Sequence, residues 1–218
     1  MALCFAPKAQ VSSGMQLATW GYKYDFVATF FLACLLYGNT YNAGLLYDDE
    51  TAILRNRCVV DKRSTLSDVF NTDFWGYPLH MVGSHKSYRP ITTLTFRMQV
   101  QYVNGDSNLP TSLHETYVRP NGMRLHVVNI VLFAFVSAVF CIVLHCMFPF
   151  PQYTSRDKTA IRLAVLLFVV HPVHTEVVAN IVGRCELLSA LFMLLSFITY
   201  LKFLVCHAIL YFKRSEVS

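Results

Sequence analysis

Long apolar segments without charged side chains dominate the pattern of the chain. One covers residues 26–46 and another covers residues 126–148, and neither contains a Lys, Arg, Asp or Glu. A helix needs about 20 consecutive apolar residues to cross a bilayer. The two segments therefore predict membrane-spanning helices.

Two further apolar segments each contain one cationic side chain. Residues 160–173 form a short run with Arg162, and residues 187–212 contain Lys202. Both segments are expected to cross the membrane with the cationic side chain extended toward the lipid headgroups. The alternative for the shorter segment is a buried helix of a soluble protein. The pattern thus predicts about four spans, joined by one long and two short connections.

Basic residues gather in three short segments that alternate with the predicted spans. These are the tail at 1–25, the loop at 149–159 and the tail at 213–218. Short segments rich in Lys and Arg stay in the cytosol, so the long loop at 47–125 and the link at 174–186 are expected on the luminal side. The first tail has no apolar core ahead of a cleavage site, so the first span is expected to remain as an anchor.

The composition supports a membrane protein and argues against three other classes. Charged residues make up 14% and hydrophobic residues 55% of the chain, whereas globular domains carry about 25% charged residues. A disordered chain would be rich in charge and poor in apolar residues. A net charge of +5 without a Lys/Arg-rich stripe does not suit nucleic acid. Seven cysteines without a CxxC pair do not suit a disulfide scaffold.

An acidic motif directly follows the first apolar segment. Asp48, Asp49 and Glu50 stand where the long loop begins. Adjacent carboxylates raise the proton affinity of one partner, which favours a general base at the membrane surface, carried by Asp48 or Asp49. The alternative is ordinary solvation of a helix end, or a cap for the next helix.

Two parts of the long loop have a local pattern. Thr65 to Asp68 fits a capping box at the start of a short helix. The aromatic residues after it suit either a helix in the headgroup plane or a small packed core, and they are Phe70, Phe74, Trp75 and Tyr77. Residues 91–103 alternate like a strand, although helical spacing also fits them. Alternation alone favours the strand.

A basic stretch, SHKSYRP, contains side chains that suit a phosphate group. They are His85, Lys86 and Arg89, and the guanidinium of Arg offers a planar fork for phosphate oxygens. The alternative is a solvated basic loop.

A second polar group follows the third apolar segment and comprises His171, His174 and Glu176, with Arg184 further along. It suits an acceptor or phosphate site. A metal is disfavoured because the spacing is not HExxH, and the alternative for Arg184 is an anchor at the interface. Cys58 and Cys185 both fall on the luminal side, but no spacing rule supports a disulfide between them.

Five motifs occur in order along the chain: YDDETAILRN, DFWG, SHKSYRPITTLTFR, LHVVN and HPVHTEVVANIVGRCELLSALFMLLSF. Together they resemble the N-terminal membrane region of the transmembrane O-mannosyltransferases targeting cadherins, the TMTC family. The resemblance covers the chain from about Tyr24 to Leu201.

The resemblance implies an all-α membrane protein that forms the N-terminal part of a GT-C-type glycosyltransferase fold. It implies an enzyme of the endoplasmic reticulum membrane that transfers mannose from dolichyl-phosphate mannose to Ser or Thr hydroxyls of cadherin or protocadherin proteins, with no cofactor required. It places the catalytic acid at Asp48 or Asp49. It favours a membrane-surface helix at 91–103. The donor phosphate or acceptor is then expected at Arg89, Lys86, His85, His171, His174, Glu176 and Arg184.

The chain departs from this family in two respects. Family members have more spans and an array of tetratricopeptide repeats of about 34 residues each, and this sequence shows no such repeat, so a truncated form is expected. Residues 106–119 lengthen the loop ahead of LHVVN. These departures leave an alternative function, that of a non-catalytic multi-span membrane protein or fragment that acts through partner binding.

Overall fold

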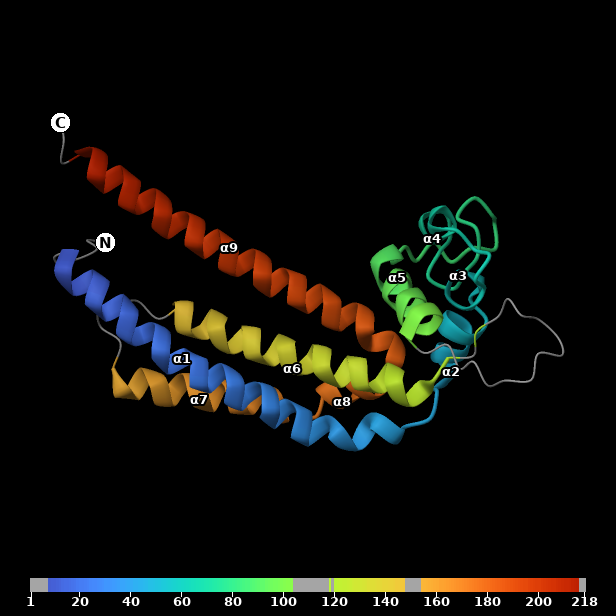
Figure 1. Ribbon diagram of the computed structural model, residues 1–218, viewed down its shortest axis with the longest axis horizontal. Coiled ribbons are helices and arrows are strands. Elements are labelled where there is room, and N and C mark those ends of the chain that lie inside the picture. The colour runs from blue at the N-terminus through green and yellow to red at the C-terminus, as the bar shows by residue number, and fades with distance from the viewer. Residues whose placement is uncertain (1–7, 104–117, 119, 148–153, 216–218) are drawn as a thin grey trace. The chain divides into compact units, whose positions relative to one another are not determined.

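The computed structural model describes residues 8–103, 118, 120–147 and 154–215 (Figure 1). Within these residues all regular secondary structure is helical, and the only β-type pairing is an isolated antiparallel bridge between Thr72 and Pro78. The expected all-α class is confirmed for this part of the chain. The extra segment at 106–119, apart from residue 118, lies outside the described residues.

The chain forms two compact units. The bundle unit contains the chain up to Leu36, Phe133–Pro172 and the chain from Ser189 onward. The loop unit contains Tyr37–Leu132 and Val173–Leu188.

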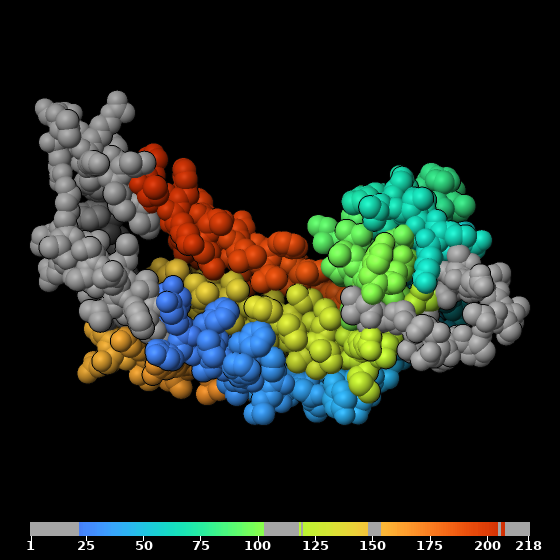
Figure 2. Space-filling view, in the orientation of Figure 1, coloured from blue at the N-terminus to red at the C-terminus, as the bar shows by residue number. Residues whose placement is uncertain are grey.

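Parts of four long helices build the bundle unit: α1 (Lys8–Tyr37), α6 (Gly122–Met147), α7 (Ser155–Val170) and α9 (Arg184–Ser215). Within this unit Phe168 of α7 stacks on Phe140 of α6, with 4.4 Å between the ring centroids. Large apolar side chains of α9, coloured orange to red in Figure 2, remain exposed, among them Phe192, Met193 and Phe203. Such a surface is typical of a helix that faces lipid or a partner.

Two described segments are long and apolar enough to cross a membrane, Gly122–Met147 and Ile181–Leu204. They overlap the spans predicted at 126–148 and 187–212. Helix α7 has 16 residues, fewer than the roughly 20 that a span requires. The count of four spans and the orientation of the chain remain predictions.

Helix α1 ends at Tyr37, whereas the sequence predicted that the first span continues to residue 46. Residues Gly38–Asn42, with the sequence GNTYN, form a 3₁₀ turn (η1) instead. The Thr40 hydroxyl donates to the Tyr37 carbonyl at 2.8 Å, so a side chain replaces the next α-helical bond. Small polar residues compete for backbone groups in this way. The prediction missed them because it counted only charged residues in the segment.

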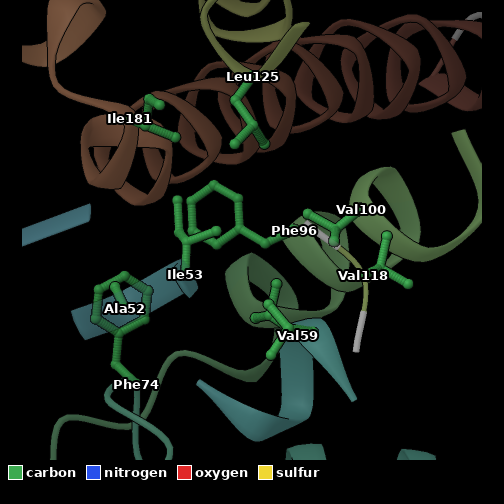
Figure 3. Packing of buried hydrophobic residues seen from close by; sticks show 10 residues of the cluster. Ala52, Ile53, Val59, Phe74, Phe96, Val100, Val118, Leu125 and Ile181 are labelled. Carbon is green, nitrogen blue, oxygen red and sulfur yellow. The ribbon is translucent and has the colours of Figure 1, made fainter. Parts of the chain in front are cut away.

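Short helices around one apolar core build the loop unit. In chain order they are α2 (Tyr47–Asp49), the π-helix η2 (Glu50–Leu54), α3 (Arg57–Val60), α4 (Leu66–Asn71), α5 (Pro90–Met98), the π-helix η3 (Gln99–Val103), α8 (His174–Ala179) and the 3₁₀ helix η4 (Ile181–Gly183), together with η1 and the first turns of α6 and α9. Figure 3 shows Phe96 of α5 in this core, with Leu125 of α6 and Ile181 of η4 pointing toward it.

The segment at 91–103 is helical, so the strand suggested by alternation is wrong. Pro90 occupies the first turn of α5, where its missing N–H is tolerated. The buried positions are Thr92, Thr93, Phe96, Arg97, Gln99 and Val100. They recur every three or four residues, because one face of the helix packs on the core. A helix at this place, as the family resemblance implies, is confirmed, and its location at the membrane surface remains a prediction.

The capping box at the start of α4 is also confirmed. The Asp68 N–H donates to the Thr65 hydroxyl at 3.2 Å, and the Thr65 N–H donates to the Asp68 carboxylate at 2.6 Å. Of the aromatic residues that follow, Phe74 is buried in the core while Phe70 and Tyr77 are exposed. The packed-core alternative therefore holds for Phe74.

Candidate active site

The structure separates the two acids that the sequence placed side by side. Asp48 is exposed, whereas Asp49 is completely buried. One carboxylate oxygen of Asp49 accepts the Leu46 N–H at 2.9 Å, and the other accepts the Val182 N–H at 3.0 Å. Asp49 thus caps the helix that carries it and also anchors η4, a segment 133 residues away in the sequence.

Burial raises the pKa of the Asp49 carboxyl above its ordinary value, because the charged form loses water. The N–H groups of Leu46 and Val182 and the nearby imidazole of His126 oppose this effect without cancelling it. The acid-base chemistry of Asp49 is therefore governed by the protein interior, while the Asp48 carboxylate is open to solvent.

Arg184 lies in the same region with only 1% of its surface exposed. Its Nε donates to the Asn129 side-chain oxygen at 2.9 Å, and its Nη2 donates to the Leu125 carbonyl at 3.1 Å. The guanidinium also lies over the Phe96 ring, 4.4 Å from the centroid. A buried cation is costly unless it is paired and hydrogen-bonded, and these contacts, with the attraction of Asp49, offset part of that cost.

Asn129 connects Arg184 to the segment that Asp49 anchors. Its amide nitrogen donates to the carbonyls of Asn180 and Ile181 at 3.2 and 3.1 Å. Gly183, in the same segment, has no room for a side chain, because a Cβ at this position would lie 2.3 Å from the Val177 carbonyl oxygen. We name Asp49, His126, Asn129 and Arg184 the buried polar cluster.

The sequence interpretation did not assign roles to His126 and Asn129, although both belong to the LHVVN motif. A signal was present, since two polar residues three positions apart share one face of an apolar helix. His126 is fully buried and interacts electrostatically with both Asp49 and Arg184. Polar groups in such a helix need a partner within the protein.

The three side chains predicted in SHKSYRP have different surroundings. Arg89 is exposed; its guanidinium lies 5.0 Å from the centroid of the Phe74 ring, and its Nη1 donates to the Cys185 sulfur at 3.0 Å. The Lys86 ammonium instead donates to the carbonyls of Leu79 and Met81. Lys86 is therefore engaged by its own loop, while Arg89 is presented outward.

His85 is exposed. Cys58 and Cys185 are both free, so the structure has no disulfide between them.

The residues of HPVHTE are divided between the units. His171 ends α7 in the bundle unit, and His174 and Glu176 lie in α8 of the loop unit. Across the described ranges, no group of three His, Cys, Asp or Glu side chains is arranged to hold a metal ion. Of the residues predicted from the motif that begins with HPVHTE, Arg184 interacts electrostatically with Asp49.

The fold and this cluster define an all-helical protein with membrane-type helices and an acid-bearing loop packed around a buried arginine. Comparison with curated proteins identifies the family. The chain is 41% identical over 177 residues to Protein O-mannosyl-transferase TMTC4 of Homo sapiens, a match over 78% of this chain and 22% of that protein. It is 39% identical over 166 residues to Protein O-mannosyl-transferase TMTC3 of Mus musculus, over 76% of this chain and 15% of that protein.

A third relative, Protein O-mannosyl-transferase TMTC1 of Homo sapiens, is 33% identical over 174 residues, covering 77% of this chain and 17% of that protein. The chain therefore belongs, over the matched region, to the TMTC family, and the resemblance found in the sequence is confirmed. It spans about a fifth of the length of the curated relatives it matches. No family model and no solved structure matches it.

Proposed function

We propose that this chain is the active-site portion of a membrane protein O-mannosyltransferase with a GT-C-type fold. The donor is dolichyl-phosphate mannose, the acceptors are Ser or Thr hydroxyls of cadherin-type proteins, and the location is the endoplasmic reticulum membrane. The observation that carries the proposal is the acid pair, in which an exposed Asp48 adjoins a buried Asp49. The names of the relatives support the type of reaction.

In this mechanism Asp48 is the general base and Asp49 positions it. The Asp48 carboxylate takes the proton from the acceptor hydroxyl, whose oxygen forms a bond to the anomeric carbon of mannose. The bond from that carbon to the phosphate oxygen breaks, and dolichyl phosphate leaves with the electron pair. Asp49 does not take this role because both of its oxygens already accept backbone N–H groups.

Arg89 suits the leaving phosphate. It is exposed, and arginine can offer two parallel N–H groups to phosphate oxygens. A positioned cation of this kind stabilises the negative charge that develops as the glycosidic bond breaks. A phosphate monoester is a good leaving group and Arg89 stabilises its charge, so the proposed mechanism requires no metal ion.

Mannose transfer in microsomal membranes tests the proposal. The comparison uses this chain and a version extended by the downstream region of a TMTC relative, each with and without Asp48→Asn. We expect the substitution to lower transfer by about a hundredfold to ten-thousandfold in any version that is active, as for the loss of a general base.

Glu50→Gln is the matched control for that substitution. Glu50 is the next acid in the motif, and its side chain pairs with Arg55 at 2.6 Å. It should retain near-parental transfer. Near-parental transfer by Asp48→Asn would show that Asp48 is not the base. Activity confined to the extended version would identify the chain as an incomplete enzyme.

A further inference from the structure

The loop between Asp73 and Arg89 is folded around one buried carboxylate. One oxygen of Asp73 accepts the N–H groups of Trp75 and Tyr77 at 3.0 and 2.9 Å. The other accepts the Ser84 hydroxyl at 2.6 Å and the His85 N–H at 3.0 Å. Asp73 is 1% exposed, so one side chain joins the beginning of the loop to its end.

These hydrogen bonds stabilise the charged form of the acid. Burial by itself raises the pKa of the Asp73 carboxyl, but the bonds from Ser84, Tyr77, Trp75 and His85 outweigh it and hold the pKa below its ordinary value. The Asp73 carboxylate is therefore stabilised as an anion by donors of its own loop.

The same loop determines where Arg89 lies. The Phe74 N–H donates to the Ser87 carbonyl at 2.7 Å, which holds the beginning and the end of the loop next to each other at Phe74. The Phe74 ring then lies 5.0 Å from the Arg89 guanidinium. Pro90 restricts the backbone of Arg89 from the other side. Asp73 is thus connected to Arg89 through the buried aromatic ring next to it in the sequence.

Arg89 retains donors for a ligand in this arrangement. The one hydrogen-bond acceptor it contacts among the described residues is the Cys185 sulfur, and a thiol sulfur is a weak acceptor. The guanidinium has five N–H donors in a fixed fork. A phosphate can therefore be bound without displacing a strong internal partner.

We propose that Asp73 is a positioning residue that, through Phe74, holds Arg89 in place to bind the phosphate of a lipid-linked donor. The inference rests on the proposed function of Arg89. The inference adds a role for the DFWG motif in phosphate binding. Asp73 of DFWG closes the loop by accepting hydrogen bonds from Ser84 and His85 of SHKSYRP.

Trp75 provides a local readout of this loop in the 218-residue chain. Its ring contacts Phe74, with 5.3 Å between the centroids, and the chain has one other tryptophan, Trp20. In a Trp20→Phe background reconstituted in nanodiscs, the emission of Trp75 is followed while dolichyl phosphate is added. Dolichol tests the contribution of the phosphate, and phosphatidylserine tests binding to ordinary anionic headgroups.

We expect Arg89→Lys and Asp73→Asn each to weaken dolichyl phosphate binding by on the order of tenfold, as for the loss of a charged hydrogen bond. The Asn side chain has an NH₂ group where Ser84 and His85 require an acceptor. The double variant should bind no more weakly than the weaker single variant, because both changes remove the same contact. Asp68→Asn is the matched control, since it removes another acid of the loop unit that caps α4, and it should bind like the parent.

The outcomes separate the two proposals. Parental binding by Arg89→Lys, or an equal response to phosphatidylserine, overturns the phosphate role of Arg89 and this inference with it. Weakened binding by Arg89→Lys with parental binding by Asp73→Asn overturns the positioning role alone. Multiplying effects in the double variant also overturn it, because the two residues then act separately. If Asp73→Asn loses helical circular dichroism, Ser84→Ala replaces it; we then expect a smaller weakening that is again absent in the Arg89→Lys background.

Discussion

Two clusters of charged side chains, one from each unit, differ in burial. In the loop unit, Asp49 and Arg184 have 0% and 1% of their surface exposed. In the bundle unit, Asp25 accepts the Arg162 Nε at 3.0 Å, and the side chain of Arg162 is 62% exposed. The Asp25 carboxylate also lies 3.3 Å from the His145 Nε2, so this cluster joins α1, α6 and α7.

The difference shows which charges determine the structure. An exposed ion pair contributes about 0–1 kcal/mol to stability because water competes for both partners. A buried polar group that loses its hydrogen-bond partner cannot bond to water instead, so the loss costs about 1–3 kcal/mol, and more for a charged group. We therefore expect the loop unit to depend on its charged cluster and the bundle unit to depend mainly on apolar packing.

The largest effect is expected for Arg184→Met. This substitution removes the guanidinium that attracts Asp49 and leaves the Asn129 oxygen and the Leu125 carbonyl without the donors it supplies. Each buried group left unsatisfied costs about 1–3 kcal/mol, so the folded state should lose about 2–6 kcal/mol. Thermal unfolding in detergent, followed by circular dichroism, measures the loss. A variant that unfolds at the parental temperature would contradict the role assigned to Arg184.

A pH-dependent effect is expected for Asp49→Asn. The folded state raises the pKa of Asp49 above its ordinary value of 3.8, so the folded protein binds this proton more tightly than the unfolded chain does. Stability from this group therefore increases as the pH falls through the folded pKa toward 3.8, with a slope of at most about 1.4 kcal/mol per pH unit.

The Asn variant lacks this part of the pH dependence. Unfolding measured at a series of pH values above 3.8 tests it, and an identical profile for parent and variant would refute it. Asp73 does not interfere, because its lowered pKa affects stability only below the ordinary value.

The smallest effect is expected for Arg162→Met in the bundle unit. Because the guanidinium is largely exposed, its removal should change stability by about 0–1 kcal/mol. The same thermal assay applies, with Arg184→Met as the reference. A loss as large as that of Arg184→Met would show that the two clusters are equivalent and that burial does not distinguish them.

Parts of the candidate site could be predicted from the sequence. The sequence singles out the acid motif and Arg184 because charged residues beside apolar segments are uncommon and chemically informative. It singles out Arg89 because a guanidinium in a basic stretch suits a phosphate. The same reasoning did not distinguish Asp48 from Asp49, because adjacent residues share one composition and one local pattern. It also grouped Lys86 with Arg89, although the Lys86 ammonium contacts carbonyls of its own loop.

The sequence alone determined what depends on neighbouring residues. It determined the capping box at Thr65 and the apolar segments that overlap Gly122–Met147 and Ile181–Leu204, because caps and apolar runs act over a few residues. Tertiary structure decided which acid is buried and which residues surround it. Asp49 contacts a segment 133 positions away, and Arg184 contacts Asn129 at a separation of 55. Such pairs form only when the chain folds, since burial makes an internal partner necessary for each charge, and no local pattern specifies which partner that is.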